Sequence, residues 1–213
     1  MVERNAYTIH NNKVISTTFN IKWMSGFSLS QKRKNIENLH SIIQEKYNTS
    51  LDSILEVSTK STVEVGRLLS SMNLKVKIKD TYYCFESVYQ SSKVYQASLL
   101  DDEYQMLEWL SLTGFEVKKL SKEIKHNLIK FKCEGIEYPL NPPTLFYDYL
   151  YIRSVVNIPD LYEKISRYTF FTDIEFNPNN MISTQAKSIC LYKLLYENNH
   201  IKEYLSNPKE FYE

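Results

Sequence analysis

The sequence predicts an α+β protein, mainly helical with small β-sheet elements, folded as a single domain over residues 1–213 with a core at about 13–205. Apolar residues recur at helical spacing in most segments, and two small groups of segments alternate apolar with polar residues as strands do. The length suits one substantial core. Because the strand groups are few and small, α+β fits better than α/β.

The first strand is predicted at 13–23, where β-branched and aromatic residues are frequent. A helix is expected within 26–47, because Ser28 and Gln31 have the spacing of a capping box before apolar residues at helical spacing. A short strand should end at Val57.

The next predicted helix has an apolar face, formed by Val65, Leu68, Leu69 and Met72. Residues 74–80 alternate apolar residues with lysine, which indicates a half-buried edge strand. The segment at 82–85 is either a second strand or the entry to the next helix.

Two helices are expected in the middle of the chain. The first covers about Phe85 to Gln96, and the second covers 101–113, with Gly114 after its end and Phe115 as a packing cap.

A hairpin is predicted at 128–140, turning at Glu134-Gly135. An aromatic-rich helix should follow Pro142-Pro143, and 160–168 forms a further segment. Residues 171–180 are expected to be a polar loop, and the last main helix runs from about Ser183 to Asn198.

Composition excludes several functions. The net charge of +1 gives no general basic excess for a nucleic-acid backbone, so any DNA contact should be local. Four glycines form no phosphate-binding loop, and three separated cysteines suggest buried, reduced thiols. The four histidines form no metal pair or catalytic triad, so no metal or cofactor is expected. No apolar signal or membrane-spanning run is present, which leads us to expect a cytoplasmic protein.

Three polar clusters are candidates for chemistry. On a helix, Glu86, Gln90 and Lys93 share one stripe, although spacing alone favours an ordinary solvated face. The segment 171–178 carries three polar residues that are either turn formers or ligand contacts. Residues 58–61 either cap a helix or hold a phosphate at its N-terminus.

Several blocks of the chain resemble one family in the expected order. They include "LEVSTKS", "GRLLSSMNL", "FESVYQSSKVY", "YPLNPPTLFYDYLYI" and "YTFFTDIEFNPNNMISTQAKS". This chain is similar to the NADAR (YbiA-like) superfamily, and most similar to the NADAR antitoxins associated with DNA-ADP-ribosylating toxins. The resemblance implies a DNA ADP-ribosyl glycohydrolase that removes ADP-ribose from guanine bases and is paired with an ADP-ribosyltransferase toxin, as an antitoxin or in counter-defence.

The resemblance also implies which residues form the site. Lys93 stands at the position of a lysine that holds the ribose as a Schiff base, Glu86 is the proton relay, and Asp173 is a candidate second carboxylate. The substrate-binding residues it implies are Gln90, Tyr89, Ser70, Asn73, Lys60, Ser61, Glu175, Asn177, Gln185 and Ser188, with Ser58 beside them. The substrate would be ADP-ribosylated guanine in single-stranded DNA or as a flipped base.

Some positions depart from the superfamily pattern. Ser87 stands where a histidine is usual, Tyr89 where a phenylalanine is usual, and "FTDIEFNP" replaces an Asp-x-x-Trp-Gly segment. Two other functions remain open: an N-glycosidase on a small nucleotide such as a riboflavin-pathway intermediate, and a non-catalytic module that binds ADP-ribose or a toxin. Sequence also leaves open whether burial of Lys93 or its attraction to Glu86 decides its pKa.

Overall fold

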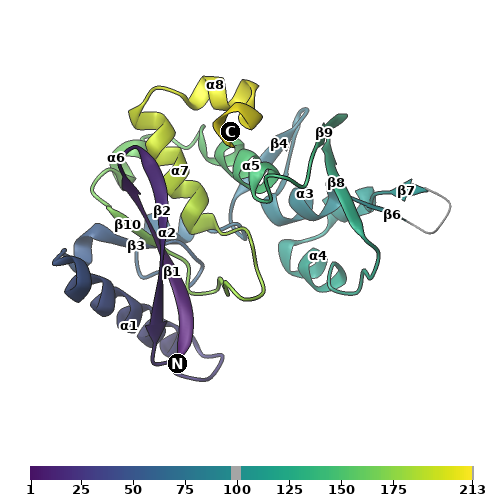
Figure 1. Cartoon of the computed structure of the whole chain (residues 1–213). Helices are drawn as coiled ribbons and strands as arrows, with labels where there is room; N and C mark the ends of the chain where they lie inside the picture. The colour runs from purple at the N-terminus through teal and green to yellow at the C-terminus, as the bar shows by residue number, and fades with distance from the viewer. Residues whose placement is uncertain (97–101, 213) are drawn as a thin grey trace. The chain divides into compact units, whose positions relative to one another are not determined.

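The computed structural model describes residues 1–96 and 102–212 (Figure 1). Helices and small sheets are mixed, which confirms the α+β class. The chain divides into two compact units: unit 1 is Met1–Ser70 with Ile158–Glu203, and unit 2 is Ser71–Asn157 with Tyr204–Glu213. The single domain expected from sequence stays a prediction. No helix of the described residues is long and apolar enough to cross a bilayer.

Unit 1 is built on a four-stranded sheet in the order β2-β1-β10-β3. These strands are β2 (Lys13–Ile21), β1 (Val2–His10), β10 (Phe170–Thr172) and β3 (Ile54–Glu56). The pairs β2–β1 and β1–β10 are antiparallel, whereas β10 and β3 are parallel. The predicted strands at 13–23 and before Val57 are confirmed.

Two strands of this sheet were missed by the sequence analysis. The strand β1 pairs on both sides, although its first half carries Arg4 and Asn5, which weaken the strand pattern. The predicted polar loop 171–180 is wrong at its start, because Phe171 and Thr172 belong to β10. Both segments are ordered by pairing with distant parts of the chain rather than by local propensity.

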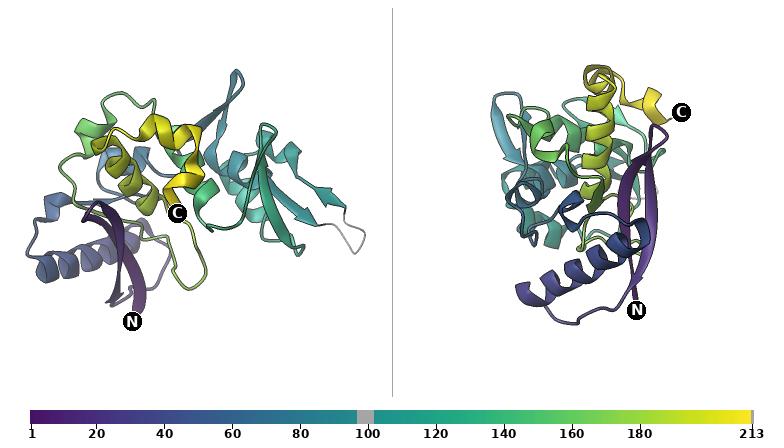
Figure 2. Two further views of the ribbon diagram at one scale, coloured as in Figure 1. Left: turned by 45° about the horizontal axis from the view of Figure 1, so that its top comes forward. Right: turned by 90° about the vertical axis from the view of Figure 1, so that its left-hand side faces the viewer.

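The helix α1 (Leu29–Tyr47) packs on one face of this sheet. Its N-cap is Ser28, and the predicted capping box with Gln31 is present. The buried cluster on this face joins Ile36, Leu39 and Ile43 of α1 to sheet residues such as Ala6, Phe19, Ile54 and Phe170. The predicted helix within 26–47 is therefore confirmed, and its apolar stripe packs on the sheet. Figure 2 shows the ribbon of α1 beside the strands β1 and β2.

Alternate strand residues, such as Leu55 and Phe171, point to the other face and are fully buried. The helix α7 (Gln185–Glu197) contacts β1, β2 and β10 there, which confirms the predicted last main helix. Short elements complete unit 1: η1 (Leu51–Ser53), α2 (Glu64–Leu68) and α6 (Leu161–Ile165). The predicted helix through Met72 is wrong in extent, because α2 ends at Leu68, whose side chain is exposed.

Unit 2 contains two groups of strands. The hairpin of β4 (Lys75–Ile78) and β5 (Thr81–Cys84) confirms the predicted edge strand and decides that 82–85 is mostly strand. The second sheet has the order β7-β6-β8-β9. Its strands are β7 (Glu103–Tyr104), β6 (Lys93–Gln96), β8 (Leu128–Cys133) and β9 (Ile136–Tyr138).

The predicted hairpin at 128–140 is β8–β9, and its turn residues Glu134 and Gly135 both have positive φ, at 50° and 82°. These backbone angles suit a two-residue hairpin turn, for which glycine is well adapted. The helices of unit 2 are α3 (Phe85–Ser91), α4 (Gly114–Leu120) and α5 (Leu145–Val155), with η2 (Leu107–Ser111) and η3 (Pro208–Tyr212). The helix α8 (Ile201–Ser206) lies at the sequence boundary of the units.

The predicted helix at 101–113 is wrong. Residue 101 lies outside the described residues, and the remainder forms β7 and η2. Gly114 does not end a helix but begins α4, after a capping box formed by Thr113 and Glu116. Phe115 is exposed rather than a packing cap. The sequence analysis read the acidic start of the segment as a helix N-terminus, whereas the Thr113-to-Glu116 spacing marks the real one.

Candidate active site

The first candidate site lies in unit 2, on α3. Glu86 and Gln90 are only 5% and 6% exposed, so the helix face they share is buried and not solvated. Gln90 Nε2 donates a hydrogen bond of 2.7 Å to Glu86 Oε1. Gln90 Oε1 is buried and accepts no hydrogen bond from the described residues. A buried, unpaired amide oxygen is costly, which suggests a bound hydroxyl or amine as its partner.

The predicted helix to Gln96 is wrong, because α3 ends at Ser91 and Lys93 begins β6. The hydroxyls of Ser91 and Ser92 both donate to the carbonyl oxygen of Val88, at 3.1 and 2.7 Å. Such back-bonding by serine weakens the helix locally. The chain then pairs with β8, where Lys93 lies opposite Phe131.

Lys93 nevertheless stays close to the α3 pair, although it is not on the helix. Its Nζ lies 5.3 Å from the centre of the Tyr89 ring. No described residue forms a hydrogen bond or close ion pair with this amine. Burial lowers the pKa of Lys93, and the opposing charge of Glu86 offsets this only in part. Burial therefore outweighs the attraction to Glu86, and the lowered pKa shifts the protonation equilibrium of Lys93 toward the neutral, nucleophilic amine.

Tyr89 belongs to an aromatic cluster that walls this region of unit 2. Its ring stacks near Phe131 and Phe146, at centroid distances of 5.5 and 6.1 Å, and meets Tyr147 edge-on at 5.1 Å. These contacts provide the low-dielectric surroundings that desolvate Lys93. The Tyr89 ring therefore packs within this cluster beside the Lys93 amine, and this position favours a role in desolvating Lys93 over a role in stacking on a base.

Gly114 allows α4 to approach Glu86 closely. A methyl group at this position would lie 3.3 Å from Glu86 Cβ and 3.0 Å from Cys84 Sγ. The short N-terminal turn of α4 therefore packs directly against the base of the Glu86 side chain, which helps to bury it.

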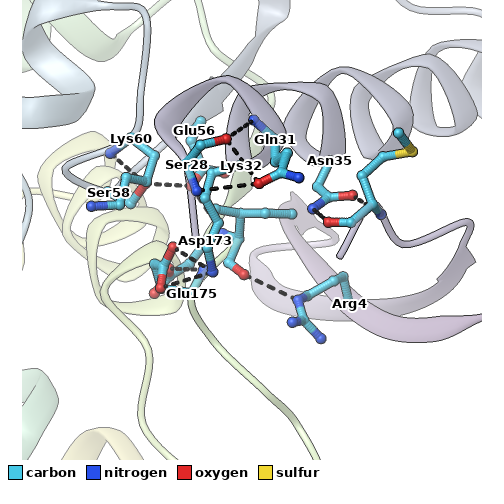
Figure 3. A network of polar contacts seen from close by, with 12 residues as sticks. Arg4, Ser28, Gln31, Lys32, Asn35, Glu56, Ser58, Lys60, Asp173 and Glu175 are labelled. Carbon is cyan, nitrogen blue, oxygen red and sulfur yellow. Dashed lines mark hydrogen bonds and ion pairs between the residues drawn. The ribbon is translucent and has the colours of Figure 1, made fainter. Parts of the chain in front are cut away.

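The second candidate site lies in unit 1 and centres on Glu56 (Figure 3). This carboxylate is 3% exposed and receives three hydrogen bonds: from Ser58 Oγ at 2.6 Å, Thr172 Oγ1 at 2.7 Å and the Ile174 N–H at 2.9 Å. His40 Nε2 lies 2.9 Å from Thr172 Oγ1 on the other side. Burial lowers the pKa of His40 to about 4, so the ring is neutral, and it raises the pKa of Glu56.

Asp173 follows Thr172 and points to the α7 side of the sheet. It accepts hydrogen bonds from Thr184 Oγ1 at 3.0 Å and from the Glu175 N–H at 3.1 Å. Burial and the nearby Glu56 charge raise the pKa of Asp173 to about 7. The two nearby carboxyl groups therefore resist full ionisation together.

A cationic cluster lies beside this pair. Arg4 Nε donates to the carbonyl oxygen of Ile174 at 3.1 Å, and its guanidinium stacks 4.4 Å over the Trp23 ring. Lys32 approaches the same ring at 5.4 Å and forms an ion pair with Glu175 at 3.1 Å. The side chain of Glu175 is 41% exposed, so this ion pair forms at the surface.

The other predicted residues of unit 1 are placed as follows. Ser61 is buried and its Oγ accepts from the Val63 N–H, whereas the N–H of half-buried Lys60 donates to Ser58 Oγ. These bonds stabilise the turns before α2 but do not cap it, because the N-cap of α2 is Val63 and no side chain caps the helix, so the expected capping role of 58–61 is wrong. Asn177 Oδ1 accepts from the Asn179 N–H, which is a turn-forming role.

Three further residues of unit 1 and one of unit 2 were predicted to bind substrate only because they lie in sequence blocks that resemble the family. Ser70, Gln185 and Ser188 are buried, and Ser188 Oγ donates to the Thr184 carbonyl oxygen inside α7. Asn73 is exposed in the turn before β4. Their binding roles stay predictions.

Glu56 was missed as a functional residue. It lies in the short segment Ile54 to Val57, where every other side chain is apolar. A carboxylate within a buried strand is rare unless its oxygens are paired, so this pattern was the available signal.

The α+β fold thus carries a buried glutamate, bonded to a glutamine one helical turn later, and a lysine whose pKa is lowered by burial. The chain belongs to the DarT1-associated NADAR antitoxin family, whose model matches residues 2–213. A search of curated proteins finds no match. The protein is thus a NADAR-type antitoxin, of a family described by its association with DarT1.

Proposed function

We propose that this protein is a DNA ADP-ribosyl glycohydrolase, which removes ADP-ribose from guanine bases and so reverses the damage done by a DarT1-type toxin. The observation that carries the proposal is the desolvated Lys93 amine beside the buried Glu86–Gln90 pair. A carboxylate and an unpaired amine in one apolar setting are suited to nucleophilic cleavage of an N-glycosidic bond. The family's association with DarT1 supports the substrate class.

The first chemical step uses Lys93 as the nucleophile. The neutral amine attacks the anomeric carbon of the ribose attached to guanine, and the carbon–nitrogen bond to the base breaks. The electron pair of that bond leaves on guanine, while Glu86 takes a proton from the attacking nitrogen and passes it to the base. The ribose ring then opens: the bond from the anomeric carbon to the ring oxygen breaks as the lysine nitrogen forms a double bond to that carbon, and the remaining proton of the nitrogen moves to the ring oxygen. The lysine thereby holds the opened ribose as a Schiff base.

Water completes the reaction. It adds to the carbon of the Schiff base, and Lys93 departs as an amine, which releases ADP-ribose and regenerates the enzyme. Gln90 positions Glu86 through its amide N–H, and its free carbonyl oxygen accepts a ribose hydroxyl. The role of Asp173 as a second carboxylate stays a prediction from the family resemblance.

The test is to incubate the protein with a guanine-ADP-ribosylated oligonucleotide and, separately, with an aminopyrimidine ribotide. Release of free ADP-ribose with restored, unmodified DNA is expected, together with a borohydride-trapped protein adduct. Cleavage of the ribotide alone would instead identify a small-nucleotide N-glycosidase. A stable complex with intact modified DNA would identify a binding module.

A further inference from the structure

Unit 1 also contains a cavity of about 330 Å³, which the proposed cleavage reaction does not use. It lies between α1, η1, the edge strand β3 and the segments 61–63 and 167–168, and we call it the α1–β3 cavity. Its volume is at the lower end of the range for small-molecule sites. Glu56 forms part of its wall, so the cavity borders the buried carboxylate network.

Two guanidinium groups line the α1–β3 cavity, those of Arg33 and Arg167. Arg33 Nε is buried, and no described residue accepts its hydrogen bond. Arg167 donates through one Nη to the Tyr168 hydroxyl at 2.7 Å, which is a neutral partner. A buried guanidinium N–H without an acceptor is costly, and its best partner is an anion with several oxygens. A phosphate group meets this requirement.

The remaining lining limits the charge of the ligand. Glu37 and Asp52 also line the cavity, and they disfavour a ligand with many phosphates. Their carboxylates are instead acceptors for sugar hydroxyls or an exocyclic amine. Ile36 and Leu51 supply apolar surface for a flat ring.

We propose that the α1–β3 cavity binds one nucleoside monophosphate unit, with its phosphate on Arg33. The shared chemistry is a phosphate, a sugar and a base. The bound nucleotide is either a free mononucleotide or part of a larger ligand, such as the adenylate half of ADP-ribose or one nucleotide of a DNA strand. The proposal goes beyond the glycohydrolase function, because it assigns a site to residues outside the Lys93 and Glu86 region.

Isothermal titration calorimetry of the whole protein tests the proposal, with AMP, adenosine and inorganic phosphate as probes. AMP is expected to bind more tightly than either of its fragments. Arg33→Met keeps the side-chain length but removes the donors, and it should weaken AMP binding by roughly tenfold or more. The matched control is Lys34→Met, because Lys34 is exposed on the same helix and does not line the cavity.

A second variant avoids the arginine. Ser41 is exposed at the cavity, so Ser41→Trp should block the space and weaken AMP binding while the melting temperature stays near that of the wild type. The proposal is overturned if AMP fails to bind the wild type, if Arg33→Met binds as the wild type does, or if Lys34→Met loses as much affinity.

Two further titrations identify the source of the nucleotide. Loss of ADP-ribose affinity in Arg33→Met supports the adenylate half as the occupant, and loss of affinity for an unmodified pentadeoxynucleotide supports a nucleotide of the strand. If Arg33→Met changes neither the affinity for ADP-ribose, nor that for the pentadeoxynucleotide, nor that for AMP, the cavity is not a nucleotide site. These titrations need no turnover, so a failure of the glycohydrolase assay leaves their result intact, and the reverse also holds.

Discussion

Gln90 holds Glu86 by a hydrogen bond of 2.7 Å across one turn of α3, and both side chains are buried. This bond uses the amide N–H and leaves the amide oxygen without a partner among the described residues. The hydrogen bond fixes both side chains, but the amide oxygen still lacks a donor. This is expected of groups that bind a ligand, whereas a purely structural pair would have all its hydrogen bonds formed.

Lys93→Ala is expected to abolish release of ADP-ribose from modified DNA, because no other group supplies the proposed nucleophile. The fold should persist, since the half-buried side chain of Lys93 forms no hydrogen bond with the described residues. Release is measured by chromatography, and the covalent adduct by mass spectrometry after borohydride treatment. Lys132→Ala is the control, because Lys132 is exposed on the neighbouring strand β8. An adduct that persists in Lys93→Ala would rule out the Schiff-base role of this lysine.

Glu86→Gln should slow the single-turnover rate by about 10²- to 10⁴-fold, the usual range for loss of a proton-transfer group. The amide is isosteric, so circular dichroism should show a native fold. Glu137→Gln on β9 is a suitable control, because Glu137 is exposed and pairs with Lys130 at the surface. A wild-type rate in Glu86→Gln would show that this carboxylate only packs.

The stability of the protein should fall as pH rises from about 4 to about 7, because of Asp173. Its pKa is raised from 3.8 to about 7, so the folded state holds a proton that the unfolded state has released in this range. Asp173→Asn removes the titrating group and should raise the melting temperature at pH 8 more than at pH 4. Asn retains an acceptor for the Glu175 N–H. Equal changes in melting temperature at the two pH values would contradict the assignment.

Gly66→Ala should destabilise unit 1 by about 2–4 kcal/mol, as overpacking against backbone does. An added methyl group would lie 2.1 Å from the Glu56 carbonyl oxygen and 2.4 Å from Ser61 Oγ. The end of β3 must then move. Urea unfolding measures the loss in the free energy of unfolding. Gly135→Ala is not an equivalent control, because Gly135 has a positive φ of 82°, which alanine adopts only with strain. Val65→Ala on α2 serves instead, since Val65 is only half-buried.

Sequence alone predicted elements whose determinants are local. The Ser28–Gln31 capping box and the Glu134-Gly135 turn each act within four residues, and both were found. The end of α3 could not be predicted, because Lys93 becomes a strand residue only by pairing with Phe131. The strand β10 is likewise defined by its partners β1 and β3.

The candidate site likewise has features that the sequence indicates and features that depend on tertiary packing. Glu86, Gln90 and Lys93 were singled out by spacing and by resemblance, but their burial and the lowered pKa of Lys93 follow from tertiary packing. Glu56 could not be recognised as a partner of Asp173, because the two are joined by parallel pairing of strands distant in the chain. A single sequence carries no direct signal for that contact.

The bond from Thr172 to Glu56 spans 116 residues, and the larger segment of unit 2, Ser71–Asn157, lies between its two ends. During translation, the ribosome must therefore synthesise this segment before β10 can enter the sheet of unit 1. A nascent antitoxin that stalls before residue 170 lacks two of the three donors to Glu56, those of Thr172 and Ile174. The sheet of unit 1 can therefore be completed only after most of the chain has been synthesised.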